Sequence, residues 1–111
     1  MSRHELVRLQ DIKEAVELIS GYAARASDFR DGRDDRLLQE AVLFRLAVIG
    51  EAVKNLSAET CAREPGVDWT AWAGLRDVIS HSYFRVDMEI IWDTVDRDVP
   101  VLAAAVGRLL S

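Results

Sequence analysis

The chain has very few of the residues that form disulfides and metal centres. It contains one cysteine, Cys61, and two histidines, His4 and His81, among 111 residues. A lone cysteine cannot form an internal disulfide, and such a composition is typical of a reducing compartment. A structural zinc site takes four cysteine or histidine ligands, so three such residues are too few. We therefore expect neither a disulfide scaffold nor a structural zinc centre, and the sequence indicates no cofactor.

Long apolar runs are also missing. The first residues, MSRHELVRLQDIKEA, carry charges every few positions and contain no apolar signal core. Elsewhere the apolar runs fall well short of the roughly 18 residues that a membrane-spanning helix needs. We therefore expect a cytoplasmic protein with no membrane anchor.

The chain lacks an excess of positive charge. Lysine and arginine total 14 against 19 aspartates and glutamates, and the formal net charge is −5 at pH 7. A protein that coats nucleic acid without specificity usually needs a basic face, so this balance argues against that class. An acidic net charge still allows a small cluster of arginines at one site. Any activity on RNA must therefore depend on local charge.

The sequence does show a helical spacing of apolar residues along nearly its whole length. Apolar positions recur three and four residues apart, and no stretch alternates convincingly as a β-strand would. With 111 residues, half of them hydrophobic, we interpret residues 1–111 as one domain. The predicted fold class is all-α: an up-and-down four-helix bundle with a short extra C-terminal helix.

The boundaries of the expected helices follow from turn and capping residues. The first half of the chain is expected to form a helix over His4–Ala26, a connector over Ser27–Arg33, a helix over Asp34–Leu56 and a loop over Ser57–Asp68, with room for a helical turn at Ala58–Arg63. The second half is expected to form a helix capped by Asp68 that ends near Tyr83 or Phe84, a helix over Met88–Asp98 capped by Asp87, and a final helix over Val101–Leu110, with Pro100 fitting its first turn. The connections are short, as an up-and-down bundle requires.

The second of these helices is apolar on more than one side. Its residues 44–56, FRLAVIGEAVKNL, predict contact with another surface besides the bundle. Gly50 lies inside this helix, although glycine costs about 1 kcal/mol relative to alanine there. We interpret Gly50 as a point where a neighbouring helix approaches closely. Glu51 is either a buried group paired with an arginine or an exposed position.

Polar groups suited to phosphate chemistry gather in the string LRDVISHSY, residues 75–83. Arg76 offers a guanidinium, a group suited to binding phosphate, His81 offers an imidazole, a common general base, and Tyr83 offers a phenol. At about 100° per residue, Arg76, Ser80 and Tyr83 share one stripe of the helix, whereas His81 lies roughly 140° from Arg76. His81 is instead spaced as the i, i+4 partner of Asp77.

Two arrangements could bring Arg76 and His81 together. The helix end could unwind near Ser82, or two copies of the helix could pack about a two-fold axis. We favour the second, which also explains the apolar faces of the helix over Asp34–Leu56. In such a dimer, His81 could take the proton of a ribose 2′-hydroxyl while Arg76 holds the phosphate by two parallel hydrogen bonds. Asp77 would orient His81, if the two touch.

Each residue also has an ordinary structural explanation. Arg76 and Asp77 could form a surface ion pair, His81 could cap the helix, and Tyr83 could pack at the rim beside Phe84. As a functional group, Tyr83 could stack on a base or donate to a phosphate. We assign no role to Tyr22 or Cys61.

The order of motifs along the chain resembles the HepT-like family of the HEPN superfamily. The motifs are IGEAVKNLS at 49–57, GLRDVISHSYFRVD at 74–87, IIWDTV at 90–95 and DVPVL at 98–102. The resemblance spans nearly the full length. Its most specific element is an arginine followed after four residues by a histidine and then, after one more, by a tyrosine.

This resemblance implies a small helical homodimer that cuts RNA, a tRNA or an mRNA, without a metal ion. It implies that the protein is the toxin of a type VII-like toxin–antitoxin module. The family's composite site at the dimer cleft implies Arg76 and His81 as catalytic residues. To these we add Asp77, Ser80 and Glu51 as supporting residues.

The resemblance also implies a protein partner, an MntA-type minimal nucleotidyltransferase that serves as antitoxin. Such a partner attaches AMP units from ATP to the motif tyrosine, which is Tyr83 here. Adding phosphate charge and adenine beside the cleft would repel and block RNA. Antitoxin action by modification, by binding in a hetero-oligomer, or by both stays open.

A second hypothesis is a non-catalytic dimeric module that binds a nucleotide or a nucleotidyltransferase. Many relatives carry asparagine after the motif arginine, where this chain has Asp77. An ionised aspartate only accepts hydrogen bonds and repels phosphate. This departure and the acidic net charge favour the module, whereas the intact Arg76, His81 and Tyr83 favour the ribonuclease.

Overall fold

The computed structural model describes all 111 residues, and every regular element in it is helical. The elements, in order, are α1 (Arg3–Ser27), the 3₁₀ turn η1 (Gly32–Asp34), α2 (Arg36–Lys54), the short α3 (Ala58–Ala62), α4 (Trp69–Ser82), the 3₁₀ turn η2 (Tyr83–Arg85) and α5 (Met88–Leu110). The all-α prediction is confirmed.

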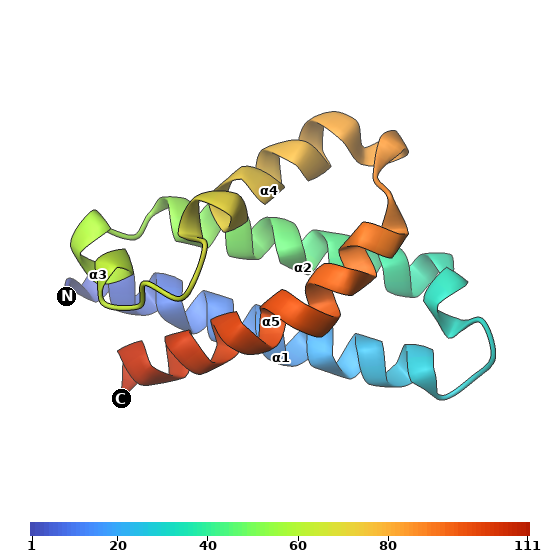
Figure 1. The fold of residues 1–111 in the computed structure, drawn as a ribbon, viewed down its shortest axis with the longest axis horizontal. Helices are drawn as coiled ribbons and strands as arrows, with labels where there is room; N and C mark the ends of the chain where they lie inside the picture. The colour runs from blue at the N-terminus through green and yellow to red at the C-terminus, as the bar shows by residue number, and fades with distance from the viewer.

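The four long helices run alternately up and down along the long axis of the molecule (Figure 1). Helix α2 lies between α1 and α4 and packs extensively on both, whereas α5 packs along α1. Helix α4 has no comparable contact with α5, and its C-terminal end diverges from the other helices (Figure 1). Helix α4 is therefore held mainly by α2.

The hydrophobic core lies between α1, α2 and α5. Its largest fully buried side chains are Leu9, Ile12 and Ile19 of α1, Val42, Leu46 and Ile49 of α2, and Leu102 and Val106 of α5. Helix α4 contributes only Trp72 and Ile79 to the buried set. No helix combines the length and the hydropathy needed to cross a bilayer. The exposed residues of α4 include Val78, Ser80 and His81 near its C-terminal end, and these are free for other contacts.

Helix boundaries agree with the local signals in the sequence. Asp68 and Asp87 cap α4 and α5, each accepting a hydrogen bond from a backbone N–H of the first turn, as predicted. Helix α2 is two residues shorter at each end than expected, with Asp35 as its N-cap and Asn55 as its C-cap. The predicted turn within the 57–68 loop is the short helix α3.

The C-terminal region differs from the prediction, because residues 88–110 form one helix and not two. Pro100 lies inside α5, although proline removes a backbone donor and crowds the preceding turn. The helix continues because Val95, Val99 and Leu102, on both sides of the proline, are buried in the core. The predicted extra C-terminal helix is therefore wrong, and the short additional helix of this fold is α3.

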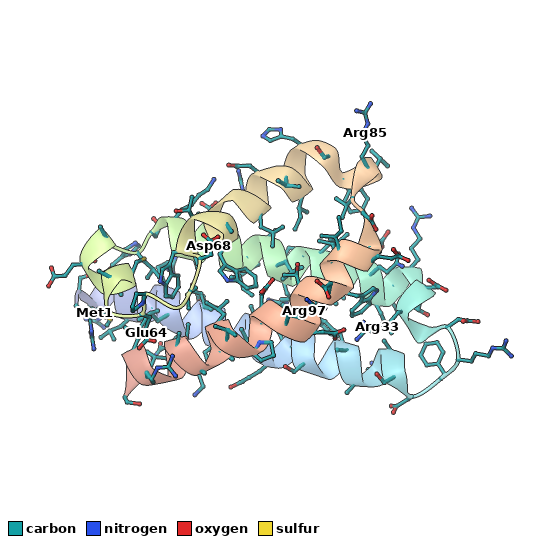
Figure 2. All side chains as sticks on the ribbon, in the orientation of Figure 1. Met1, Arg33, Glu64, Asp68, Arg85 and Arg97 are labelled. Carbon is teal, nitrogen blue, oxygen red and sulfur yellow. The ribbon has the colours of Figure 1, made fainter.

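The connector between α1 and α2 is tied to α5. The Arg33 guanidinium forms two hydrogen bonds with the Asp96 carboxylate, 2.6 and 2.9 Å long, and stacks over the Trp92 ring. The Trp92 indole N–H donates to the Arg33 carbonyl oxygen at 2.9 Å. Figure 2 shows Arg33 at this junction. These contacts fix the connector against α5, the partner helix of α1.

A buried carboxylate joins the start of α1 to the start of α3. Glu5, only 8% exposed, accepts hydrogen bonds from the backbone N–H groups of Ser57 at 2.6 Å and Ser2 at 3.4 Å. The backbone and side-chain hydrogen bonds from Ser57 lower the pKa of Glu5 from 4.5 to about 2. The ionised form of Glu5 is therefore favoured by folding.

We expect Glu5→Gln to lower the free energy of unfolding most above pH 4.5. The folded-state pKa of Glu5 is about 2 against an ordinary value of 4.5, so its stabilisation is fully present above 4.5 and is lost as the pH falls through 2. Urea unfolding across this range should show the difference between variant and wild type shrinking with acidity. Glu14→Gln, at an exposed position of the same helix, is the matched control. A difference that is constant with pH would contradict the assignment.

Candidate functional site

The string that the sequence singled out lies on α4 and on η2, which follows it. The Asp68 side chain accepts from the Ala71 N–H at 3.1 Å and so starts the helix. The helix continues to Ser82, where the backbone departs from helical values, with φ −131° and ψ 26°. Figure 2 shows Asp68 near the start of α4 and Arg85 beyond its end, pointing away from the other helices.

Helix α4 meets α2 in backbone-to-backbone proximity at Gly50. A Cβ atom built on Gly50 would lie 2.8 Å from the Arg76 Cβ, 2.8 Å from the Trp72 carbonyl oxygen and 3.0 Å from the Arg76 nitrogen. Only a residue without a side chain fits there. The interpretation of Gly50 as a point of close approach between helices is confirmed. The segment that packs against Gly50 is the turn of α4 that carries Arg76.

Four charged side chains gather beside this contact, and we call them the charge cluster: Glu51 and Lys54 of α2, and Arg76 and Asp77 of α4. The Arg76 Nε lies 3.4 Å from the Glu51 Oε2, and its Nη1 lies 3.4 Å from the Asp77 Oδ1. The Lys54 ammonium is 3.0 Å from both Asp77 oxygens. The cluster thus joins two cations to two anions.

The charge cluster faces solvent. Its side chains are between 35% exposed, for Lys54, and 59% exposed, for Glu51. Glu51 is therefore an exposed residue that pairs with an arginine, which combines the two alternatives that the sequence left open. Ion pairs this exposed contribute little to stability. Arg76 can consequently exchange a carboxylate for another anion without disturbing the fold.

Asp77 is neutralised by lysine and not by histidine. A hydrogen bond from Lys54, followed by one from Arg76, lowers the pKa of Asp77 below its ordinary value. The predicted pairing of Asp77 with His81 is not formed, because no hydrogen bond or ion pair joins them and Lys54 occupies the carboxylate. Lys54 was not predicted from the sequence, although it follows Glu51 by three residues and lies on the same face of α2.

His81 faces a different side of α4 from Arg76. The helix is regular through Ser82, so the two residues stay roughly 140° apart around its axis. The backbone unwinds only after His81, and this end of the helix does not swing the imidazole toward Arg76. His81 and Ser80 are both exposed and form no side-chain hydrogen bond. Within one subunit, Arg76 and His81 do not converge.

Tyr83, the first residue of η2, is paired with a carboxylate from α2. Its hydroxyl donates to the Glu40 Oε1 at 3.0 Å, and the same oxygen accepts from the Arg36 Nε at 3.1 Å. The contact with Glu40 raises the pKa of Tyr83 above its ordinary value. The Tyr83 ring meets Phe84 edge to face at 5.4 Å, and Phe84 is 95% exposed. Glu40 was not predicted from the sequence, because it lies 43 residues from Tyr83 and no local pattern links the two.

The structure thus separates the candidate residues into three places. Arg76, Asp77 and Glu51 meet in the charge cluster, Ser80 and His81 lie in solvent on α4, and Tyr83 is held by Glu40. No three His, Cys, Asp or Glu side chains gather closely enough to hold a metal ion.

Comparison with known proteins places the chain in a family. The family described as "Ribonuclease HepT-like" matches residues 12–109. The protein "Probable ribonuclease HepT" of Thermococcus cleftensis is 38% identical over 109 residues, covering 98% of both chains. "Putative RNase TTE0752" of Caldanaerobacter subterraneus is 36% identical over 102 residues, covering 92% of this chain and 87% of its own.

A longer relative contains the same region as part of a larger protein. The "Gamma-glutamylcyclotransferase and putative RNase MJ0434" of Methanocaldococcus jannaschii is 32% identical over 110 residues, covering 99% of this chain. The chain spans about half, 49%, of that relative. No solved structure matches the chain significantly. The match over residues 12–109, together with full-length similarity to named ribonucleases, shows that the chain belongs to the HepT-like ribonuclease family.

Proposed function

We propose that this protein is a metal-independent RNA endonuclease whose active site forms between two copies of the chain. The observation that carries the proposal is the placement of Arg76 and His81 on different sides of one regular helix. Within a monomer the two groups cannot act on the same phosphate. A two-fold related copy can place the imidazole of one subunit beside the guanidinium of the other. Membership of a ribonuclease family supports the proposed activity on RNA.

Exposed apolar side chains near the candidate site support association of two copies. Val78 on α4 is 55% exposed, and Phe44 on α2 is 61% exposed. Val78 precedes His81 by three residues and therefore shares its face of α4. A second copy packed over this face would cover apolar surface and approach the imidazole at the same time.

The proposed chemistry needs only a base and a phosphate-binding cation. Neutral His81 takes the proton of the ribose 2′-hydroxyl, and the freed oxygen attacks the adjacent phosphorus. Arg76 of the other subunit binds the non-bridging oxygens and stabilises the charge that develops on them. The bond from phosphorus to the 5′ oxygen breaks, and that oxygen takes a proton from solvent. The products are a 2′,3′-cyclic phosphate and a free 5′-hydroxyl.

The test is cleavage of RNA by the purified protein in the presence of a chelator. We expect fragments that end in a 2′,3′-cyclic phosphate, identified by mass spectrometry, with no loss of rate when EDTA is added. Intact RNA after prolonged incubation would contradict the proposal, and so would cleavage that stops on chelation.

A second candidate function is a non-catalytic partner of a nucleotidyltransferase. The observation that favours it is the engagement of Arg76 by Glu51 and Asp77, which compete with any phosphate. This candidate predicts stable binding to the nucleotidyltransferase together with intact RNA in the assay above. Cleavage of RNA would exclude it.

We further propose that the protein is the toxin of a type VII-like module, controlled by an MntA-type nucleotidyltransferase that adenylylates Tyr83. The Tyr83 side chain is 37% exposed and so can be reached by a partner enzyme. Adding AMP would place a phosphate charge at the end of the helix that carries Arg76 and His81, where it would repel RNA. Mass spectrometry after incubation with the partner and ATP should find AMP on Tyr83. AMP on any other residue instead would contradict this assignment.

Asp77→Asn is expected to strengthen RNA binding a few-fold. The substitution changes the charge cluster from neutral to singly positive, because Lys54 and Arg76 then face Glu51 alone. Fluorescence anisotropy with a labelled RNA should report it, measured in a His81→Ala background that suppresses cleavage. The gain should shrink as salt is added.

The matched control for Asp77→Asn is Asp93→Asn. It removes one carboxylate from an exposed ion pair with Arg97 on α5, away from the charge cluster. We expect it to change the affinity much less. Equal effects of the two substitutions would mean that only the net charge of the protein matters.

A further inference from the structure

The hydroxyl of Tyr83 has a dedicated proton acceptor on another helix. The Glu40 carboxylate accepts from this hydroxyl at 3.0 Å, across a separation of 43 residues. The Arg36 guanidinium, one turn earlier on α2, donates to the same carboxylate oxygen at 3.1 Å. The phenol, the carboxylate and the guanidinium thus form a connected row on the surface of the α2–η2 junction.

This row matches what a phenol needs in order to act as a nucleophile. A tyrosine hydroxyl is mostly protonated at neutral pH and attacks phosphorus well only if a base removes its proton as the new bond forms. Glu40 already touches that proton. The hydrogen bond to Glu40 raises the pKa of Tyr83, so the phenolate is not formed in advance and the proton has to move during the reaction.

On the basis of the adenylylation of Tyr83 proposed above, we propose that Glu40 is the general base of that reaction. The Tyr83 oxygen attacks the α-phosphorus of ATP and forms the new O–P bond. The bond from the α-phosphorus to the oxygen bridging the β-phosphorus breaks, and pyrophosphate leaves. The phenolic proton passes to the Glu40 carboxylate and from there to solvent. The toxin itself, in addition to its partner enzyme, then supplies a catalytic group for its own modification.

The surroundings of the hydroxyl favour an incoming phosphate. A cavity of about 200 Å³ borders Tyr83 and is lined by Arg36 and Glu40 together with apolar residues such as Leu43 and Met88. Arg36 donates a hydrogen bond to the Glu40 oxygen that also accepts from the reacting Tyr83 hydroxyl. Once Tyr83 carries a phosphodiester, its oxygen no longer donates to Glu40. Arg36 is then placed to bind the new anion and to separate it from the carboxylate.

The test compares rates of AMP transfer to wild type, Glu40→Gln and Glu40→Asp. Each purified protein is incubated with an MntA-type nucleotidyltransferase and Mg-ATP, and AMP on Tyr83 is followed by mass spectrometry. Loss of a general base lowers rates by about 10²–10⁴-fold, so we expect at least a 100-fold drop for the glutamine variant. Glu40→Asp keeps a carboxylate and should recover part of the rate.

A pH profile separates this chemical role from a structural one. In Glu40→Gln the remaining rate should rise steadily with pH as hydroxide and the phenolate replace the lost base. The wild-type rate should change much less over the same range, because a base is already in contact with the proton. A variant that merely misplaced Tyr83 would keep the wild-type profile at a lower rate, and that result would overturn the proposal.

Two controls complete the design. Glu14→Gln removes a carboxylate from an exposed site on α1 and should be modified at the wild-type rate. Thermal melting of each variant confirms that the fold is retained. No modification of wild-type Tyr83 would overturn the proposed regulation itself. Normal modification of the wild type together with an unchanged rate in Glu40→Gln would overturn the role of Glu40 alone.

Discussion

Replacing His81 with alanine is expected to lower the rate of RNA cleavage by about 10²–10⁴-fold, the usual contribution of a general base. The side chain is exposed and packs in no core, so the fold and its thermal stability should be unchanged. The measurement is the single-turnover rate on a labelled RNA, with binding measured separately. His4→Ala is a matched control, since it removes the other histidine, which is exposed at the start of α1. Wild-type cleavage by His81→Ala would rule out the proposed base.

Replacing Arg76 should affect the same step for a different reason. In the proposed mechanism Arg76 stabilises the developing charge, and losing such a donor typically lowers the rate by about 10²–10³-fold, so we expect a loss of this size for Arg76→Ala. Arg76→Lys keeps the charge but not the two parallel hydrogen bonds, so it should restore binding better than it restores the rate. If Arg76→Lys were indistinguishable from wild type in rate, the guanidinium would act only as a general positive charge.

Gly50→Ala is expected to disturb both stability and activity. The added methyl group would meet the Trp72 carbonyl oxygen and the Arg76 Cβ at 2.8 Å each, so α4 has to move away from α2. Overpacking of this kind typically costs about 1–3 kcal/mol of the free energy of unfolding. Because the displaced turn carries Arg76, we expect a tenfold or larger loss of cleavage in the fraction that stays folded.

The control for Gly50→Ala is Gly21→Ala. Gly21 lies within α1, and a Cβ there would have nothing within 4 Å. Alanine at such a helical position should stabilise the protein by about 0.5–1 kcal/mol and leave cleavage unchanged. Urea unfolding and the cleavage rate, measured on both variants, decide the matter. Unchanged stability and activity in Gly50→Ala would contradict the assigned role of this glycine.

The parts of the fold that the sequence predicted well depend on local interactions. A capping side chain lies within a few residues of the N–H that it binds, and so Asp68 and Asp87 could be identified as helix starts. Gly50 could be recognised because glycine is unfavourable inside a helix unless space is short. In each case the physical cause lies within one or two turns of the residue concerned.

The prediction failed where tertiary packing overrides a local rule. Pro100 is a strong local signal for a helix boundary, yet α5 passes through it because buried residues on both sides hold the helix against the core. The i, i+4 spacing of Asp77 and His81 predicted a pair, but Lys54, 23 residues earlier, binds the carboxylate instead. Glu40 was missed for the same reason. Contacts between helices leave no periodic signal in the chain.

The measurement that tests the composite site most directly is a mixture of two inactive variants. Arg76→Ala and His81→Ala subunits, co-expressed with different tags and purified through both, give dimers that contain one of each. A site that takes Arg76 from one subunit and His81 from the other is then intact once in each mixed dimer, so about half of the wild-type activity should return. Mixed dimers as inactive as either parent would contradict a site shared between subunits.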